Sequence, residues 1–275
     1  MTHSRGRPFA RIESHVERHM TKEVISVDAA STLRDVERVL RERGVSSALV
    51  RDGDRPVGVV SRTDLLRAAR RQAAGHEEKL APLPAQSVGE LCARAPITVG
   101  AEAIVSEAAA RMVEERVHRV FVEREGRIIG VLSTRDVLDA IVSARVPTPI
   151  EDVMSHPLYT IPADATVAHA TDRLAQAHVS GLTVLDQDGW PIGFIGQTEA
   201  LLARDRPGTT SVEDAMNPAL VCLHSRAELH RAAKLARAAS ARRVLVVEDR
   251  RAAGVLTPLD FARAVSGGSA QRGTP

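Results

Sequence analysis

The chain alternates between short apolar runs and longer segments whose apolar residues recur at helical spacing. In the first block, a strand-like run at 24–27 precedes a segment at 33–40 whose apolar side chains fall three and four residues apart, which predicts a helix with one buried face. Two further apolar runs, 47–50 and 56–60, flank an Asp-Gly pair and predict a hairpin. A second helix is predicted to follow, so the block has the order β-α-β-β-α.

This block recurs four times, and each copy ends in the same pattern: a glycine, two apolar residues, three mostly polar residues and an acid. A unit of about 50 residues buries too little surface to be stable alone, so neighbouring copies are expected to pack on each other. The sequence therefore predicts an α/β (α+β) protein of four repeats packed as two pseudo-symmetric pairs. The four copies of the pattern occupy residues 58–64, 130–136, 193–199 and 254–260.

Proline-rich and polar stretches separate the copies and set the expected domain boundaries. The longest is an insertion at 70–84, and the segment 144–149 divides the two halves. We predict a first pair at 12–145 (repeats 12–71 and 85–145), a second pair at 148–266 (repeats 148–205 and 209–266), and flexible tails at 1–11 and 267–275.

Composition excludes several classes of protein. Aromatic residues make up only 2% of the chain, too few for a platform that stacks bases, and the net charge of +2 does not indicate a general polyanion binder. No apolar run approaches the length of a membrane span. Cys92 and Cys222 match no disulfide or zinc pattern, lie in apolar runs and are expected to be buried. We expect a cytoplasmic protein that is not an enzyme and has no catalytic cofactor or metal site.

The repeated Ser/Thr-x-x-Asp has two physical interpretations. As a helix-capping box it satisfies backbone N–H groups and contributes about 1 kcal/mol, and Ser225 to Glu228 is expected to form such a box at another helix. As a ligand site, the carboxylate accepts both hydroxyls of a ribose, while the hydroxyl and the free N–H groups of the helix start hold a phosphate. The fourfold repetition favours the ligand site for copies one, two and four.

These residues resemble the CBS domain, the cystathionine-β-synthase-type repeat, over nearly the whole chain. The resemblance rests on the four segments above and on a methionine ahead of three copies, at Met20, Met154 and Met216, with Cys92 at that place in copy two. It implies that tandem repeats pair into Bateman modules. It also implies clefts that bind adenosine-containing ligands: AMP, ADP or ATP, with S-adenosylmethionine and NAD as further candidates. Such repeats sense and do no chemistry, so we expect a homodimer that signals to an effector protein.

The family combines the Ser/Thr-x-x-Asp of one repeat with the first strand and basic residues of its partner, which implies four clefts. The fourth departs from the pattern at Gly196, Glu199 and Cys222, and we doubt that it binds a nucleotide in the usual way. Arg62 and Arg135 are phosphate candidates or exposed first-turn residues. The first cleft would use Ser61, Asp64, Thr98, His118 and Arg119; the second Ser133, Asp136 and Ser26; the third Thr257, Asp260 and Thr160; and the fourth retains Arg242 and Arg243.

A nucleic-acid-binding or transcription-linked protein is the alternative. All but three of the 37 basic residues are arginines, and arginine is the better bidentate phosphate ligand. A GC-rich genome produces the same bias, and no nucleic-acid reader motif is present.

Overall fold

The computed structural model describes residues 10–72, 83–92, 94–203, 206–207, 209–241, 243–248 and 251–267. Arg242, most of the predicted insertion and nearly all of both predicted tails lie outside these residues. The described residues form two compact units, which are treated separately. The even-repeat unit comprises the described residues up to Glu23, Ile97–Leu158 and those from Leu220 onward, and thus holds repeats two and four. The odd-repeat unit comprises Val24–Pro96 and Tyr159–Ala219, and holds repeats one and three.

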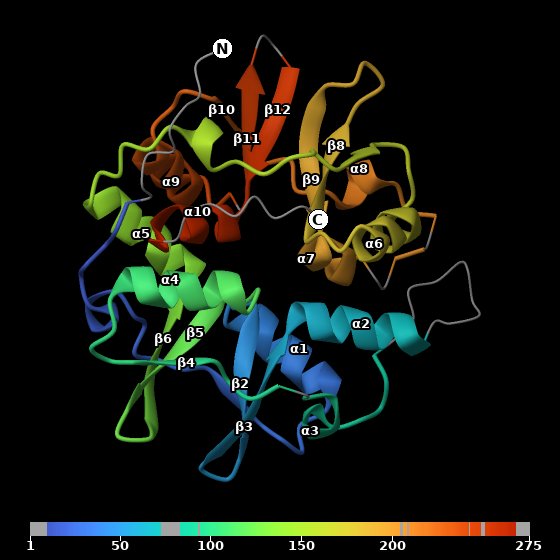
Figure 1. Cartoon of the computed structure of the whole chain (residues 1–275). Helices are drawn as coiled ribbons and strands as arrows, with labels where there is room; N and C mark the ends of the chain where they lie inside the picture. The colour runs from blue at the N-terminus through green and yellow to red at the C-terminus, as the bar shows by residue number, and fades with distance from the viewer. Residues whose placement is uncertain are drawn as a thin grey trace. The chain divides into compact units, whose positions relative to one another are not determined.

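Each repeat has the predicted β-α-β-β-α order (Figure 1). Its three strands form one sheet in which the first strand runs parallel to the second and the second antiparallel to the third. In the odd-repeat unit the elements are β1 (Ser26–Asp28), α1 (Leu33–Glu42), β2 (Ser47–Asp52), β3 (Arg55–Ser61), α2 (Arg62–Gln72), α3 (Val88–Leu91), β7 (Thr160–Pro162), α6 (Val167–Gln176), β8 (Gly181–Leu185), β9 (Pro191–Gly196), α7 (Gln197–Leu202) and α8 (Val212–Ala215).

The even-repeat unit has the same order of strands and long helices, with two 3-10 turns in place of the short helices α3 and α8. Its elements are the 3-10 turn η1 (Val16–Arg18), β4 (Thr98–Gly100), α4 (Val105–Glu114), β5 (Arg119–Arg124), β6 (Arg127–Ser133), α5 (Thr134–Ser143), η2 (Ile150–Asp152), β10 (Val221–His224), α9 (Leu229–Ala238), β11 (Val244–Glu248), β12 (Arg251–Leu256) and α10 (Pro258–Val265).

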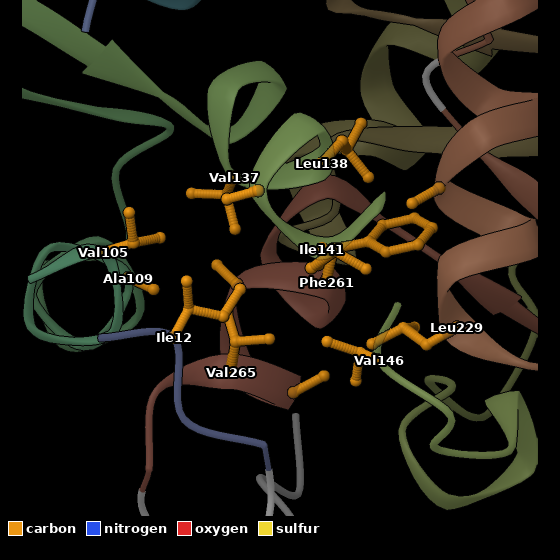
Figure 2. Packing of buried hydrophobic residues seen from close by; sticks show 14 of the residues in the cluster. Ile12, Val105, Ala109, Val137, Leu138, Ile141, Val146, Leu229, Phe261 and Val265 are labelled. Atoms are coloured by element: carbon orange, nitrogen blue, oxygen red, sulfur yellow. The ribbon is translucent and has the colours of Figure 1, made fainter. Parts of the chain in front are cut away.

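In the even-repeat unit helices of two repeats share one apolar core, whereas the odd-repeat unit has two apolar clusters, one of which combines repeat one with Ala200 and Leu201 of α7. In the even-repeat unit α5 packs on α9, and α10 packs on α4 and α5. Figure 2 shows Val105, Ile141, Leu229 and Phe261, from these four helices, converging in the interior. In the odd-repeat unit α2 packs on α7, where Thr63 Oγ1 donates a hydrogen bond to Gln197 Oε1. In the even-repeat unit the apolar faces of helices from repeats two and four are therefore buried against each other.

A short segment ahead of each repeat packs on a different repeat. We call these segments arms; they span residues 15–21, 87–92, 149–155 and 211–217. Arm one pairs with repeat two through bridges from His15 to Ile104 and from Thr21 to Val131. The exchange is reciprocal, because arm two pairs with repeat one. Its bridge joins Thr32 and Ser87, and two backbone hydrogen bonds run from Val88 to Ser31 and from Gly89 to Ala29.

Arms three and four exchange in the same way. Arm three bridges to repeat four at Ser155 and Val255, and arm four bridges to repeat three at Phe194 and Asn217. Each arm inserts one fully buried apolar side chain, and four residues later a methionine or cysteine covers a glycine of the hairpin. This exchange favours the predicted pairing of repeats one with two and three with four. The compact units divide the chain differently, so the pairing and its boundaries stay a prediction.

We expect Gly130→Ala to lower the free energy of unfolding by about 1–3 kcal/mol, the usual cost of overpacking. A Cβ at this position would lie 2.5 Å from Met20 Sδ and 3.0 Å from the carbonyl oxygen of Thr21, both in arm one. Denaturant unfolding measures the effect. Gly100→Ala is the matched control, because its Cβ would meet no atom within 4 Å. Equal unfolding free energies for the two variants would contradict the packing of the arm on this hairpin.

Candidate functional site

The predicted site residues that belong to strands lie on the sheet faces that point away from the helical cores, and the predicted acids lie in the first turns of the helices that follow. Alternate strand residues point to opposite faces, and cross-strand partners share a face. In repeat two, Val120 and Leu132 point into the helical core, whereas Arg119 pairs with Ser133, and Thr98 pairs with Phe121, on the other face. Repeat one repeats the pattern: Ser47 pairs with Ser61, and Ser26 pairs with Leu49.

The same face includes mid-strand residues that the sequence analysis did not assign. Leu49, Phe121, Thr183 and Leu245 are each less than 4% exposed, yet none belongs to the apolar clusters under the helices. Each is the cross-strand partner of a first-strand residue, namely Ser26, Thr98, Thr160 and Cys222 in chain order. The sequence does not show which of these strand residues face the helices and which face the site, because the strands are largely apolar on both faces.

The junction between β3 and α2 in repeat one is a capping box with one carboxylate oxygen left over. Asp64 Oδ2 accepts hydrogen bonds from the backbone N–H of Ser61 at 2.9 Å and from its hydroxyl at 2.6 Å. Among the described residues, Asp64 Oδ1 accepts no hydrogen bond. Ser61 and Asp64 are both half-buried, so this oxygen is able to accept a hydroxyl from a ligand.

Repeat two has the same arrangement between β6 and α5. Asp136 Oδ2 accepts from the N–H and the hydroxyl of Ser133, both at 2.7 Å. In the described part of the chain its other carboxylate oxygen likewise has no hydrogen-bond partner. Both Ser133 and Asp136 are half-buried, so repeats one and two present equivalent junctions.

Repeat four differs, because both oxygens of its acid are engaged. Asp260 Oδ2 accepts from the N–H and the hydroxyl of Thr257, both at 2.7 Å. Asp260 Oδ1 accepts from Ser155 Oγ and from Arg263, each at 2.7 Å, and Asp260 is only 1% exposed. The predicted ligand role of Thr257 and Asp260 stays a prediction, and this geometry weighs against it.

Repeat three departs from the pattern as its sequence indicates. Gly196 has no hydroxyl, and its N–H donates to Glu199 Oε2 at 3.0 Å. The acid therefore caps α7, and the neighbouring Gln197 binds Thr63 of repeat one.

The first N–H groups of these helices already have partners, which weighs against the expected phosphate-binding role. Arg62 N–H donates to the carbonyl oxygen of Ser46 at 3.0 Å, and Thr134 N–H donates to that of His118 at 2.9 Å. The serine hydroxyls accept from Asp64 N–H and Arg135 N–H. The capping hydrogen bonds are thus present in both repeats, and the role of the serines and the helix start in holding a phosphate stays a prediction.

The arginines singled out in the sequence have different environments. The guanidinium of Arg62 donates to the carbonyl oxygen of Leu40 at 3.2 Å, which places it at the C-terminal end of α1. Arg135 is an exposed first-turn residue, Arg119 is half-buried on the site face, and Arg243 is only 9% exposed. His118 is exposed directly ahead of β5.

Every predicted cleft draws residues from both compact units. Ser61 and Asp64 belong to the odd-repeat unit, whereas Thr98, His118 and Arg119 belong to the even-repeat unit. Ser26 and Thr160 are in the odd-repeat unit, and the acids expected to join them, Asp136 and Asp260, are in the even-repeat unit. The assembly of these sets stays a prediction.

The two cysteines differ in exposure. Burial, followed by the nearby carboxylate of Asp64, raises the pKa of Cys92 to about 11, so its thiol stays protonated at neutral pH. Cys222 is exposed on β10, which corrects the expectation that it is buried, although partial desolvation still raises the pKa of its thiol. The apolar run around Cys222 is misleading because alternate residues of this strand face outward.

The described residues include neither a metal-binding cluster nor a helix able to span a membrane. They contain no cluster of three or more His, Cys, Asp or Glu side chains arranged to hold a metal ion. None of the described helices combines the length and apolar character that crossing a bilayer requires.

Solved structures with the same arrangement of repeats are known from archaea. Protein MJ1225 of Methanocaldococcus jannaschii, proposed as an archaeal homologue of g-AMPK, superposes with a TM-score of 0.75 at 15% identity, covering 91% of this chain and 99% of that one. An uncharacterized conserved protein of Pyrococcus horikoshii gives a TM-score of 0.66 at 17% identity, with the same coverage. At these identities the likeness shows the fold alone.

Sequence relatives match over less than half of the chain. L-aspartate semialdehyde sulfurtransferase of M. jannaschii is 24% identical over 120 residues, which are 43% of this chain and 23% of that protein. Inosine-5'-monophosphate dehydrogenase of Korarchaeum cryptofilum is 26% identical over 130 residues, or 47% of this chain and 25% of the enzyme. The matched stretch is thus about a quarter of each enzyme.

The family model for the CBS domain matches four times, at residues 14–71, 88–143, 150–205 and 212–267. These matches account for most of the chain and coincide with the four β-α-β-β-α repeats. The chain therefore belongs to the CBS domain family.

Proposed function

We propose that the chain is a non-catalytic sensor that binds an adenosine-containing ligand, AMP, ADP or ATP, at the junctions of repeats one and two. The observation that carries the proposal is the pair of half-buried carboxylates, Asp64 and Asp136, each with one oxygen unused among the described residues. Such an oxygen accepts ribose hydroxyls, and hydrogen bonds to a charged acceptor are among the stronger ones in proteins.

Phosphate binding is assigned mainly to side chains, because the first N–H group of each helix already donates to a backbone carbonyl oxygen. Arg119 is the leading candidate: a guanidinium binds phosphate in bidentate fashion, and the residue lies half-buried on the site face of β5. Thr98, His118 and Ser26 stay predicted contacts on the strength of the family pattern. The apolar strand residues supply a surface for adenine without aromatic stacking.

Signalling follows from differential affinity, because a ligand that prefers one arrangement of the repeats shifts the population toward it. The effector protein, the cytoplasmic location and the homodimer are part of this proposal. Within each unit the helices of two repeats already pack on each other. A dimer built through these helices would have to replace those contacts, so a second copy is expected on another surface.

A thermal-shift screen separates this function from its alternative. Ligands to test are AMP, ADP, ATP, S-adenosylmethionine and NADH, with GMP as the matched control and plain duplex DNA as a separate arm. A nucleotide at 100 times its dissociation constant adds about 2.7 kcal/mol to the free energy of unfolding and raises the melting temperature. Salt-dependent binding of DNA without any nucleotide shift would favour the nucleic-acid function instead.

A further inference from the structure

We infer that Asp260 is a structural tie between arm three and repeat four, and that it is not a ligand group. The nucleotide sites are then the junctions of repeats one and two, whereas the junction of repeat four serves stability. This assignment of sites rests on the proposed function, but the tie itself does not.

The tie joins a buried carboxylate, whose two oxygens are both hydrogen-bonded, to a half-buried guanidinium. Asp260 is 1% exposed, and Arg263, one turn later on α10, binds its Oδ1 at 2.7 Å. Ser155 of arm three donates to the same oxygen at 2.7 Å, and Thr257 supplies both bonds to Oδ2. A ribose would have to displace Ser155 and Arg263 from a carboxylate that has no access to water. Removing a partner from a buried charge is costly, so this displacement is unfavourable.

The other repeats do not form the tie, and among the described residues neither Asp64 nor Asp136 is bonded by the residue three positions after it. Three residues after the acid, repeat four has Arg263, whereas repeat two has Asp139, which cannot donate to a carboxylate, and repeat one has the exposed Arg67. Asp139 instead accepts a hydrogen bond from Arg237 of α9 at 2.6 Å.

The arm residue differs as well. Thr21 occupies in arm one the place that Ser155 occupies in arm three, and both make the same backbone bridge to a hairpin. Thr21 is exposed, and in the described part of the chain no side-chain hydrogen bond joins it to Asp136. The same backbone arrangement therefore leaves one oxygen of Asp136 without a hydrogen bond among the described residues, whereas both oxygens of Asp260 are bonded.

The test compares equivalent acids in one chain. We expect Asp260→Asn to lower the melting temperature by about 4 °C or more, and by more than Asp136→Asn, because only Asp260 is a buried ion-pair partner. Calorimetric titration with AMP is expected to show an unchanged number of sites in Asp260→Asn. Asp64→Asn and Asp136→Asn are each expected to remove or weaken one site.

Two less disruptive substitutions test the tie if Asp260→Asn does not fold. Ser155→Ala removes one bond of the tie and is expected to lower the melting temperature, whereas Thr21→Ala, its counterpart in arm one, is expected to leave it within error. Equal midpoints for these two variants would overturn the tie. A loss of AMP sites in folded Asp260→Asn would overturn the inference that Asp260 is not a ligand group, and would leave the proposed function standing. If no adenosine ligand binds the wild type, the proposed function fails. The melting temperatures of the variants then test the tie on their own.

Discussion

Phe261→Ala is expected to lower the free energy of unfolding by about 3–5 kcal/mol, the range for truncating a buried phenylalanine. Phe261 is 2% exposed on α10, in the apolar cluster that also contains Ile141 of α5 and Leu229 of α9 (Figure 2). The substitution leaves a cavity where helices of repeats two and four meet. Denaturant unfolding of the variant measures the loss.

Hydrogen exchange shows whether the two repeats share this core. If they do, Phe261→Ala raises exchange in α4 and α5 of repeat two as well as in α10 of repeat four. Faster exchange confined to α10 would contradict a shared core. Leu235→Ala is the control: Leu235 lies on α9 of the same unit but is 45% exposed, so a change of less than about 0.5 kcal/mol is expected.

Asp64→Ala is expected to weaken AMP binding at the site of repeat one by about 10- to 100-fold. The variant loses a charged acceptor for ribose hydroxyls, worth about 1.5–3 kcal/mol for each bond, and each 1.4 kcal/mol is about tenfold in affinity. Arg119→Ala is expected to act in the same direction through the phosphate. Calorimetric titration gives both affinities.

Glu199→Ala is the matched control for Asp64→Ala. Glu199 occupies the equivalent position in repeat three and accepts the same kind of capping bond, from the N–H of Gly196. The junction of repeat three lacks the serine hydroxyl and the aspartate that define the proposed site. Glu199→Ala is expected to cost helix stability but not nucleotide affinity. Equal losses of affinity in Asp64→Ala, Arg119→Ala and Glu199→Ala would contradict the assignment of the site to the junction of repeat one.

The repeat architecture was predictable because its signals are local. Periodicity, turn glycines and the spacing from glycine to acid identified all four repeats, and the strand expected at 24–27 is observed one to two residues later, as β1. One local prediction was wrong: the expected capping box at Ser225 does not form. Helix α9 begins at Leu229 with Glu228 as its N-cap, and the buried hydroxyl of Ser225 has no partner among the described residues.

What the sequence did not reveal depends on contacts between distant segments. The exchanged arms appear in the sequence only as a recurring methionine, since nothing local says on which repeat an arm packs. The tie at Asp260 requires Ser155, which is 105 positions away in the sequence. The motif Thr257-x-x-Asp260 therefore resembles those of repeats one and two, although both oxygens of its carboxylate are engaged. An ion pair between Asp260 and Arg263 was visible as an i,i+3 spacing, but its burial was not.

The most direct measurement of the central claim is a calorimetric titration of the full chain with AMP, with Glu199→Ala as the control variant for Asp64→Ala. We expect saturable binding of AMP, weakened in Asp64→Ala and preserved in Glu199→Ala. Absence of saturable binding by AMP, ADP and ATP alike, in a chain whose unfolding transition shows it to be folded, would contradict the claim that the junctions of repeats one and two bind adenine nucleotide.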